Sequence, residues 1–281
     1  MLENSVMNDM NPAFLKASAM PDVQSTLDKR ALPIERVGIR GVRHPLTIRS
    51  KTGNFPSVGS FEMDVVLPAH VKGTHMSRFM ALLQKQEQAV DSTTAVTLVR
   101  EMLPLLDAKE GHVQFTYTHF VKKAAPVSGV ESLMDYEVTW MATAKQNISG
   151  ETHIELGLRA QVPVMSLCPC SKEISEFGAH NQRSHVTMTV VLDPATQMTV
   201  EDLIAAAESE ASSELWGLLK RPDEKWVTEH SYSNPKFVED LVRDVAGRLK
   251  AEQHIQSFVV EAENFESIHN HSAFARISHT K

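Results

Sequence analysis

Alternating apolar and polar residues run through much of the chain. The clearest run covers residues 152–164, where every second side chain from Ile154 to Val164 is apolar. Successive side chains of a strand point to opposite faces, so this run predicts a strand with one face on the core. Shorter runs of the same kind predict further strands at residues 34–42, 46–49, 61–67, 112–120, 136–143, 186–192, 255–262 and 268–277.

Other segments show apolar residues three and four positions apart, which is the period of a helix. In one of them Thr199 is followed three residues later by Asp202, a variant of the capping box that begins helices. In another, Asn234 precedes Pro235, a residue that suits the first helical position. Four helices are predicted in all: one that begins after Thr74, one that includes residues 96–106, one over residues 199–215 and one that begins at residues 234–235.

The order of these elements is strands, two helices, strands, and then a similar set again. Strands joined by hairpins, with helices gathered between them, predict an α+β fold with antiparallel sheet and paired helices on one face. We expect a flexible N-terminal tail at residues 1–25, a first unit at 26–167 and a second unit at 168–281. The chain contains no glycine-rich phosphate loop of the Rossmann or P-loop type.

Composition narrows the class of protein. The chain has 281 residues, of which 42% are hydrophobic and 22% charged, and this predicts a globular protein with a substantial core. No apolar run reaches the roughly 18 residues of a membrane-spanning helix, and the N-terminal residues do not resemble a signal peptide. The formal net charge of -7 argues against a general nucleic-acid binder, although a local basic cluster is still able to bind a phosphorylated small molecule.

The only two cysteines, Cys168 and Cys170, are separated by one residue. A disulfide between them would be badly strained, so we expect free or metal-bound thiols in a cytosolic protein. A thiolate here is able to bind a metal, attack an electrophile or steer protons, and Lys172 would favour the anion. The alternative is that both thiols are small buried hydrophobic groups.

Histidines occur in two polar segments. His180 lies in the turn-rich stretch 178–185, before a predicted strand, where an imidazole is well placed as a ligand or proton carrier. His269 and His271 share one face of the strand predicted at 268–277, and two imidazoles on one face are able to share a metal. The alternatives are a solvated loop histidine and two exposed strand histidines.

Glu224, in the segment 221–226, is a further acidic candidate, although by itself it has the character of a surface carboxylate. Thiol, imidazole and carboxylate donors together suit zinc or a similar divalent ion, and their wide separation in sequence indicates a catalytic site assembled from several elements. A metal with an open position lowers the pKa of its bound water. The residues alone therefore predict a metal-assisted hydrolase and leave its substrate open.

Four separate segments carry a family resemblance. They are SLCPCSKEISEFGAHNQRSHVTM at 166–188, PDVQSTLDKRALPIERVGIRGVRHPL at 21–46, KGTHMSRF at 72–79 and ESIHNHSAFA at 266–275. Together they closely resemble the type IB GTP cyclohydrolase I family. Because they occur in the family's order and span residues 20–281, the resemblance is specific.

The resemblance implies the tunnelling fold, with two fused half-barrel units per chain and most of the site in the second unit. It implies a homotetramer with active sites near subunit interfaces, located in the cytoplasm. The implied activity is that of GTP cyclohydrolase I, which converts GTP and water to 7,8-dihydroneopterin triphosphate and formate, at the entry to tetrahydrofolate and deazaguanine tRNA bases. The implied cofactor is a divalent metal, manganese or zinc or else iron, and we expect neither a nucleic-acid nor a membrane partner.

The resemblance also assigns roles to individual residues. Glu266 would anchor the edge of the guanine ring, since a carboxylate accepts hydrogen bonds from a ring amide and an exocyclic amine. Lys172 and Arg183 would bind the triphosphate, and Arg78 would reach it from another part of the tetramer. The implied metal ligands are Cys168, His180, Glu224 and one of His269 and His271, of which His269 is favoured. The implied catalytic residues are Cys170, His180 and Glu239.

Two other functions stay open. One is another enzyme of the same fold, a nicotinamide-dependent nitrile reductase acting on a deazaguanine, which would use Cys170 as a covalent nucleophile without a metal. The other is a non-catalytic metal-binding module, whose histidines and thiols would saturate the metal. Release of formate and a fluorescent pterin from GTP distinguishes the cyclohydrolase from both.

Overall fold

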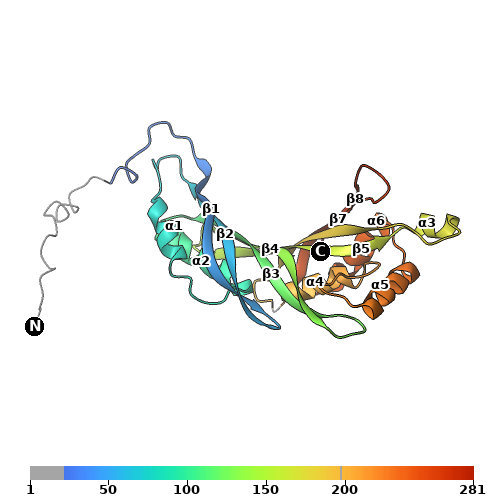
Figure 1. Ribbon diagram of the computed structural model, residues 1–281. Coiled ribbons are helices and arrows are strands. Elements are labelled where there is room, and N and C mark those ends of the chain that lie inside the picture. The colour runs from blue at the N-terminus through green and yellow to red at the C-terminus, as the bar shows by residue number, and fades with distance from the viewer. Residues whose placement is uncertain (1–21, 197) are drawn as a thin grey trace, which may run out of the picture.

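The structure is a computed structural model that describes residues 22–196 and 198–281. Its strands form one antiparallel sheet in which each strand pairs with its neighbour in chain order, from β1 to β8 (Figure 1). The predicted antiparallel α+β class is therefore confirmed. The strands are β1 (Ile34–Ser50), β2 (Gly53–Leu67), β3 (Glu110–Ala124), β4 (Glu131–Gln146), β5 (Thr152–Leu167), β6 (Asn181–Leu192), β7 (Ile255–Asn264) and β8 (Ala273–Thr280).

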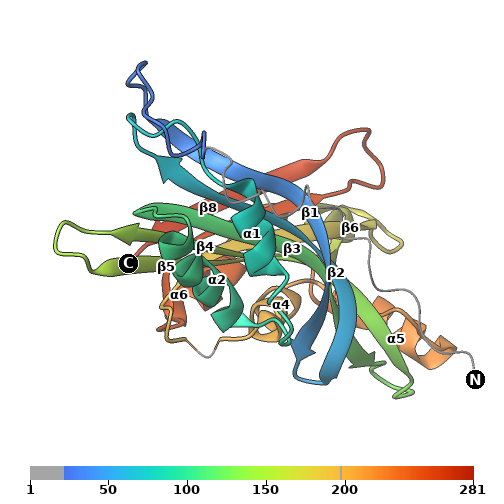
Figure 2. The ribbon, with the colours of Figure 1, turned by 90° about the vertical axis from the view of Figure 1, so that its left-hand side faces the viewer.

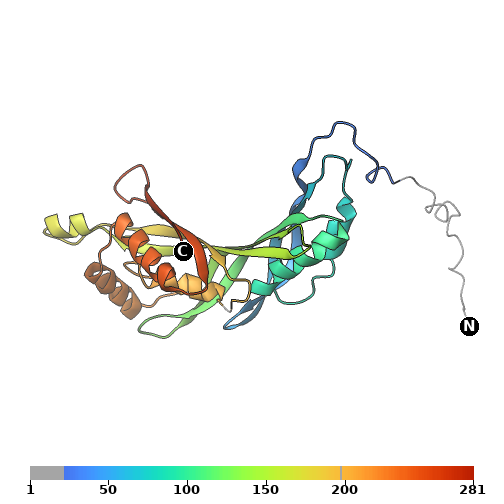
Figure 3. The same ribbon diagram turned by 180° about the vertical axis from the view of Figure 1, so that it is seen from behind.

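The helices lie in two groups along the sheet. The first group connects β2 to β3 and lies in front of the strands in Figure 2. The second group connects β6 to β7 at the other end, and Figure 3 shows both groups from behind. The first group consists of α1 (Met76–Leu83) and α2 (Ser92–Leu105), and the second of α4 (Val200–Glu208), α5 (Arg221–Ser233) and α6 (Val238–Ala251). The short α3 (Pro169–Ile174) follows β5.

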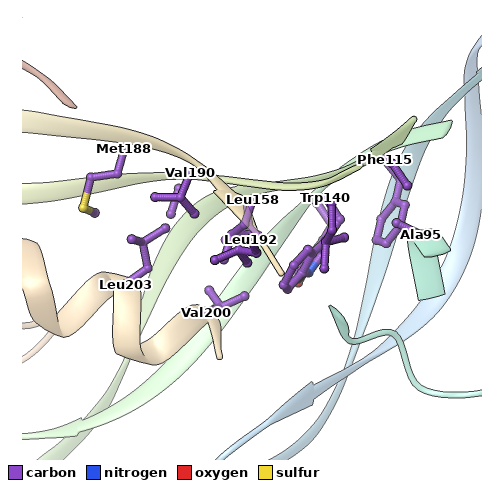
Figure 4. Packing of buried hydrophobic residues seen from close by; sticks show 14 of the residues in the cluster. Ala95, Phe115, Trp140, Leu158, Met188, Val190, Leu192, Val200 and Leu203 are labelled. Carbon is purple, nitrogen blue, oxygen red and sulfur yellow. Dashed lines mark hydrogen bonds between the residues drawn. The ribbon is translucent and has the colours of Figure 1, made fainter. Parts of the chain in front are cut away.

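One hydrophobic core joins the sheet to both helix groups, because the alternating apolar side chains of the central strands point to the helix-covered face. In Figure 4, Val190 of β6 lies opposite Leu203 of α4, and Leu192 of β6 lies opposite Val200. Between the two helix groups the Trp140 side chain is buried, and its Nε1 donates to the Tyr117 hydroxyl at 3.3 Å. The predicted placement of the helices on one face of the sheet is confirmed.

The two short strands predicted near the start of the sheet are one continuous strand, β1. Its pairing with β2 slips between Ile39 and Val42, where Gly41 has a φ of 70°, and then continues to the turn. A bulge of this kind bends a strand without ending it. Pro45 is tolerated within the strand because β1 lies at the edge of the sheet, where a missing N–H breaks no second ladder.

The helix predicted from residue 199 begins as expected but ends early. Thr199 Oγ1 accepts from Asp202 N at 3.3 Å, and the Asp202 carboxylate accepts from Thr199 N at 2.9 Å. The helix does not continue to residue 215, because the chain turns to pair with β5. In that pairing Met165 N donates to Ser213 O at 2.9 Å.

The helix predicted to open at Asn234-Pro235 begins later, as α6. Asn234 instead ends α5, a helix that the sequence did not reveal, and its side chain donates to Ala211 O at 2.8 Å. Lys236 N donates to Leu167 O at 3.1 Å. The residues between α5 and α6 are therefore bound to the end of β5 and are not helical.

The sheet continues without a break from β4 to β5, where Glu137 pairs with Gln161 and Gln146 with Thr152. The described residues thus contain a single sheet, and the division into units between residues 167 and 168 stays a prediction. Most of the tail expected at residues 1–25 lies outside the described residues. Within the described part of the chain, no helix is long and apolar enough to cross a membrane.

Candidate functional site

The segments that carry the candidate residues meet at one end of the sheet. β5 leads through Cys168 into α3, and the chain returns as β6. The loop of residues 265–272 joins β7 to β8, and Phe265 N donates to Arg183 O at 3.0 Å. Figure 1 shows α3 and this loop at the end of the molecule opposite to α1.

Cys168 is the N-cap residue of α3. Its Sγ accepts a hydrogen bond from Ser171 N at 3.4 Å, and Pro169 occupies the first turn, where its missing N–H costs no helical bond. Cys168 N donates to His180 O at 3.1 Å, and Ser171 Oγ accepts from His180 N at 3.2 Å. These bonds hold the cysteine and histidine segments side by side. Cys170, on α3, is exposed.

The ring of His180 has a defined orientation. Its Nδ1 lies 3.1 Å from Gln182 Oε1 and 3.4 Å from Ser267 Oγ. An amide oxygen only accepts, so the amide orientation assigned to Gln182 puts the proton on Nδ1 and leaves the lone pair on Nε2. A neutral imidazole oriented through one nitrogen in this way is the usual form of a metal-binding histidine.

Beneath these segments the buried face of the sheet becomes polar. Ser184 Oγ donates to Asn264 Oδ1 at 2.7 Å and lies 2.9 Å from Ser166 Oγ, and all three residues are buried. The buried Ser212 Oγ accepts from Leu167 N at 3.0 Å, which binds the end of β5 to the segment after α4. Sequence reasoning missed this network, although a polar residue at the end of each alternating apolar run marks it.

The loop of residues 265–272 contains His269 and His271, because β8 begins only at Ala273. The prediction of a strand from residue 268 was therefore wrong. The pairing of β7 with β8 ends at Asn264 and Ala273, so residues 265–272 form the connection between the two strands, and Ile268 is 64% exposed there. The two imidazole rings stack with their centroids 5.2 Å apart, and both side chains are exposed.

α5 carries Glu224 in its first turn, where the side chain is exposed. At the other end of the helix, Lys172 Nζ of α3 donates to Tyr232 O at 2.6 Å and lies 4.5 Å from the centre of the Tyr232 ring. Lys172, which was predicted to bind substrate, thus connects α3 to α5.

His185 on β6 packs edge-on against Phe265, with ring centroids 4.8 Å apart. Burial lowers the pKa of His185, and the neighbouring Arg183 lowers it further. The ring is therefore neutral near pH 7. It packs beside the site and adds no positive charge for a phosphate.

The other predicted residues are more dispersed. Arg183 is exposed on β6, Glu266 is half-buried at the start of its loop, and Glu239 is exposed in the first turn of α6. Arg78 belongs to α1 in the other helix group and donates to Leu105 O at 3.0 Å. No three His, Cys, Asp or Glu side chains form a metal-sized cluster within residues 22–196 and 198–281. The structure brings the cysteine and histidine segments together and does not assemble the full predicted set.

Comparison with protein families matches residues 20–275 to the family described as GCHY-1, type I GTP cyclohydrolase folE2. Curated proteins are similar over nearly the whole chain. A GTP cyclohydrolase FolE2 of Polynucleobacter asymbioticus is 88% identical over 272 residues, which make up 97% of this chain and 100% of that protein. A GTP cyclohydrolase FolE2 of Cupriavidus pinatubonensis is 56% identical over 98% of each chain.

Among solved structures, a urate oxidase of Bacillus sp. TB-90 has a TM-score of 0.53 at 10% identity and covers 88% of this chain and 100% of its own. The urate oxidase of Bacillus subtilis 168 also has a TM-score of 0.53, at 8% identity, and covers 88% of this chain and 98% of its own. This likeness and the sheet topology define a protein with the tunnelling fold. The chain belongs to the type I GTP cyclohydrolase family FolE2 and is an enzyme.

Proposed function

We propose that this enzyme converts GTP and water to 7,8-dihydroneopterin triphosphate and formate, for tetrahydrofolate and deazaguanine tRNA-base synthesis. Family membership supports GTP as the substrate. The observation that carries the site is the contact between the Cys168 and His180 segments, which holds a thiol and an oriented imidazole at one end of the sheet. Opening the guanine ring requires water and proton transfer next to a held base, and these segments supply groups of that kind.

A divalent metal, manganese or zinc or else iron, is part of the proposal. The donor types fit such an ion, because Cys168 offers sulfur, the His180 tautomer leaves a lone pair on Nε2, and Glu224 offers a carboxylate. We propose that these three residues, with His269 or His271, would hold it. When bound, such a metal lowers the pKa of a coordinated water toward neutrality.

The chain's own residues would bind and orient GTP around that position. Glu266 would accept hydrogen bonds from the guanine edge, and its half-buried position supports a directed contact. The exposed Arg183 is available to the triphosphate, whereas Lys172 would first have to leave the Tyr232 carbonyl. Cys170, exposed on α3, would hold or release a proton beside the reacting ring.

We propose a cytoplasmic homotetramer as the active form. β1 and β8 are the outer strands of the sheet in each chain, and an edge strand is able to pair with another copy. Arg78, in the helix group away from the site, would then contribute to the site of another subunit, with Glu239 as a further acid or base. The free thiols Cys168 and Cys170 support a reducing compartment.

Incubation of the manganese-loaded protein with GTP tests the proposal. We expect formate and a fluorescent pterin in equal amounts, with both lost on treatment with a chelator. Ser149→Ala, in the exposed turn between β4 and β5, serves as the control and should retain full activity. A metal-loaded protein that releases no formate contradicts the proposal. Metal-independent oxidation of a reduced nicotinamide by a deazaguanine nitrile would favour the reductase instead.

A further inference from the structure

Asp223, the residue before Glu224, is a carboxylate with no exposed surface. Its Oδ1 accepts from Val127 N at 2.9 Å and from Ser128 N at 2.8 Å. Its Oδ2 accepts from Ser128 Oγ at 2.6 Å and from Lys220 N at 2.8 Å. Four donors thus satisfy one buried carboxylate, which makes Asp223 part of a specific buried hydrogen-bond network.

This contact uses both carboxylate oxygens as acceptors. All four groups that face the two oxygens are donors, namely three backbone N–H groups and the Ser128 hydroxyl. Each oxygen accepts two of the bonds, so an asparagine cannot replace the aspartate fully. Its amide nitrogen would face the Lys220 N–H or the two amides of the turn, and two donors cannot bond to each other.

The partner segment belongs to the β3–β4 hairpin, and Ser128 is 95 positions away from Asp223 in the chain. Trp216 provides a second contact with the same hairpin, because its Nε1 donates to Ala124 O at 3.0 Å. Lys123 Nζ also lies 5.0 Å from the centre of the Trp216 ring. The segment that leads into α5 is therefore docked on the hairpin at two places.

The position of α5 depends on contacts of this kind. The helix follows residues 209–220, which form neither helix nor a strand of the sheet. Its last turn is bonded to α3 through Lys172 and the Tyr232 carbonyl, and its first turn is bonded to the hairpin through Asp223. The Glu224 side chain is exposed, so its location is set by the backbone of that first turn.

We propose that Asp223 is a positioning residue for the metal site, which fixes the first turn of α5 to the β3–β4 hairpin so that Glu224 presents its carboxylate to the ion. The inference rests on the proposed role of Glu224 as a metal ligand. Residues 127–128 of the β3–β4 hairpin would then support the metal site, although all of the proposed metal ligands lie after β5 in the chain.

The test measures the affinity of the metal-free, full-length protein for Mn²⁺, by competition with a chromophoric chelator. Asp223→Asn should weaken Mn²⁺ binding by about tenfold or more, as for other residues that orient a metal ligand. Ser128→Ala removes the hydroxyl donor while keeping the amide bonds, and it should weaken binding about threefold.

Asp91→Asn is the matched control. Asp91 caps α2 in the other helix group, where it accepts from Thr93 N at 2.9 Å and pairs with Arg49 at 2.8 Å. Like Asp223→Asn, this variant lacks one carboxylate at the start of a helix. Its affinity for Mn²⁺ should nevertheless stay within about twofold of that of the unchanged protein.

Addition of excess Mn²⁺ separates positioning from loss of the fold. Saturating Mn²⁺ should restore most of the GTP turnover of Asp223→Asn, because Glu224 is still present, and should not restore that of Glu224→Gln. If Asp223→Asn does not fold, Ser128→Ala carries the test by itself. Unchanged Mn²⁺ affinity in both variants, with weakened binding in Glu224→Gln, overturns the positioning role and leaves the proposed function intact. Unchanged affinity in Glu224→Gln overturns the ligand assignment and the inference with it.

Discussion

The two halves of the sheet repeat one order of elements: two strands, a pair of helices and two more strands. They differ in the helices that the second half inserts into this order. In the first half, β1 and β2 are joined by a tight turn, and residues 84–91 are all that separates α1 from α2. In the second half, α4 and α6 occupy the corresponding places between β6 and β7 and contact each other, as α1 and α2 do. Here, however, α3 lies between β5 and β6, and α5 lies between α4 and α6.

The two insertions carry much of the candidate site. Cys168 caps α3, Cys170 and Lys172 lie on it, and Glu224 lies on α5, whereas the repeated strands and helices supply the core. The difference leads us to propose that the repeat builds the frame and that the insertions supply much of the candidate chemistry. Changes in the insertions should therefore remove function and spare stability, and changes in the repeat should do the opposite.

The largest effect should come from Cys168→Ser. The substitution removes the proposed sulfur ligand, so it should release the proposed metal and lower kcat/KM by about 1,000-fold, equivalent to about 4 kcal/mol. A serine hydroxyl is a good N-cap and is able to accept from Ser171 N in place of Sγ. The thermal unfolding midpoint of the metal-free protein should therefore not change. Metal analysis, the GTP assay and thermal unfolding check these outcomes, and a metal-replete, active variant would contradict the ligand role.

The opposite behaviour is expected for Leu203→Ala in α4. Leu203 is fully buried against β6 (Figure 4), and truncation of such a leucine lowers the free energy of unfolding by about 2–5 kcal/mol. Urea unfolding measures this loss. At a temperature where the variant is still folded, its Mn²⁺ affinity should equal that of the unchanged protein. Impaired metal binding in the folded variant would show that frame and site are not separable.

The frame could be predicted from the sequence because its signals are local. The alternation over residues 152–164 identified β5, and the Thr199 and Asp202 pair located the start of α4. Each signal depends on residues that are neighbours in the chain. Where the frame was misjudged, as at the end of α4, the cause was a pairing with a distant strand that no local pattern records.

The insertions could not be predicted in this way. In α5 the buried residues are Asp223, Val227 and Ser231, of which only one is apolar, so the helix has no apolar period to detect. Its first turn is set by a hairpin 95 residues away. The polar stretch 178–185 identified His180 as a candidate, but the orientation of its ring depends on Gln182, a residue of the same stretch to which the sequence analysis gave no role.

Contact between the two halves of the sheet should weaken in acid. Glu201, in the first turn of α4, accepts from Lys51 N at 2.9 Å, and its Oε1 lies 3.2 Å from His119 Nε2. Burial raises the pKa of Glu201, but the hydrogen bonds from His119 and Lys51 outweigh it and lower the pKa to about 2, from the usual 4.5. The folded pKa lies below the unfolded value. The ionised carboxylate therefore stabilises the fold above about pH 4.5, and this contribution is lost as the pH falls toward 2.

Unfolding free energies measured against pH test this contribution in the unchanged protein and in Glu201→Gln. The shift of the Glu201 pKa from 4.5 to about 2 corresponds to about 3 kcal/mol of folding free energy. Between pH 7 and pH 2 the unchanged protein should lose that much more stability than the variant. If the two proteins lose stability in parallel as the pH falls, ionisation of Glu201 does not stabilise the contact between the two halves.

The smallest effect should come from Ser184→Ala, at the boundary between frame and site. Its hydroxyl lies between Ser166 and Asn264 in the buried network under the cysteine and histidine segments. Removing it should lower the free energy of unfolding by about 1 kcal/mol and weaken Mn²⁺ binding about twofold. Thr187→Ala, on the opposite face of β6, is the matched control and should leave Mn²⁺ binding unchanged. Equal weakening of Mn²⁺ binding in both variants would contradict this prediction. It would show that any truncation on β6 disturbs the site and that the buried serine network has no specific effect on it.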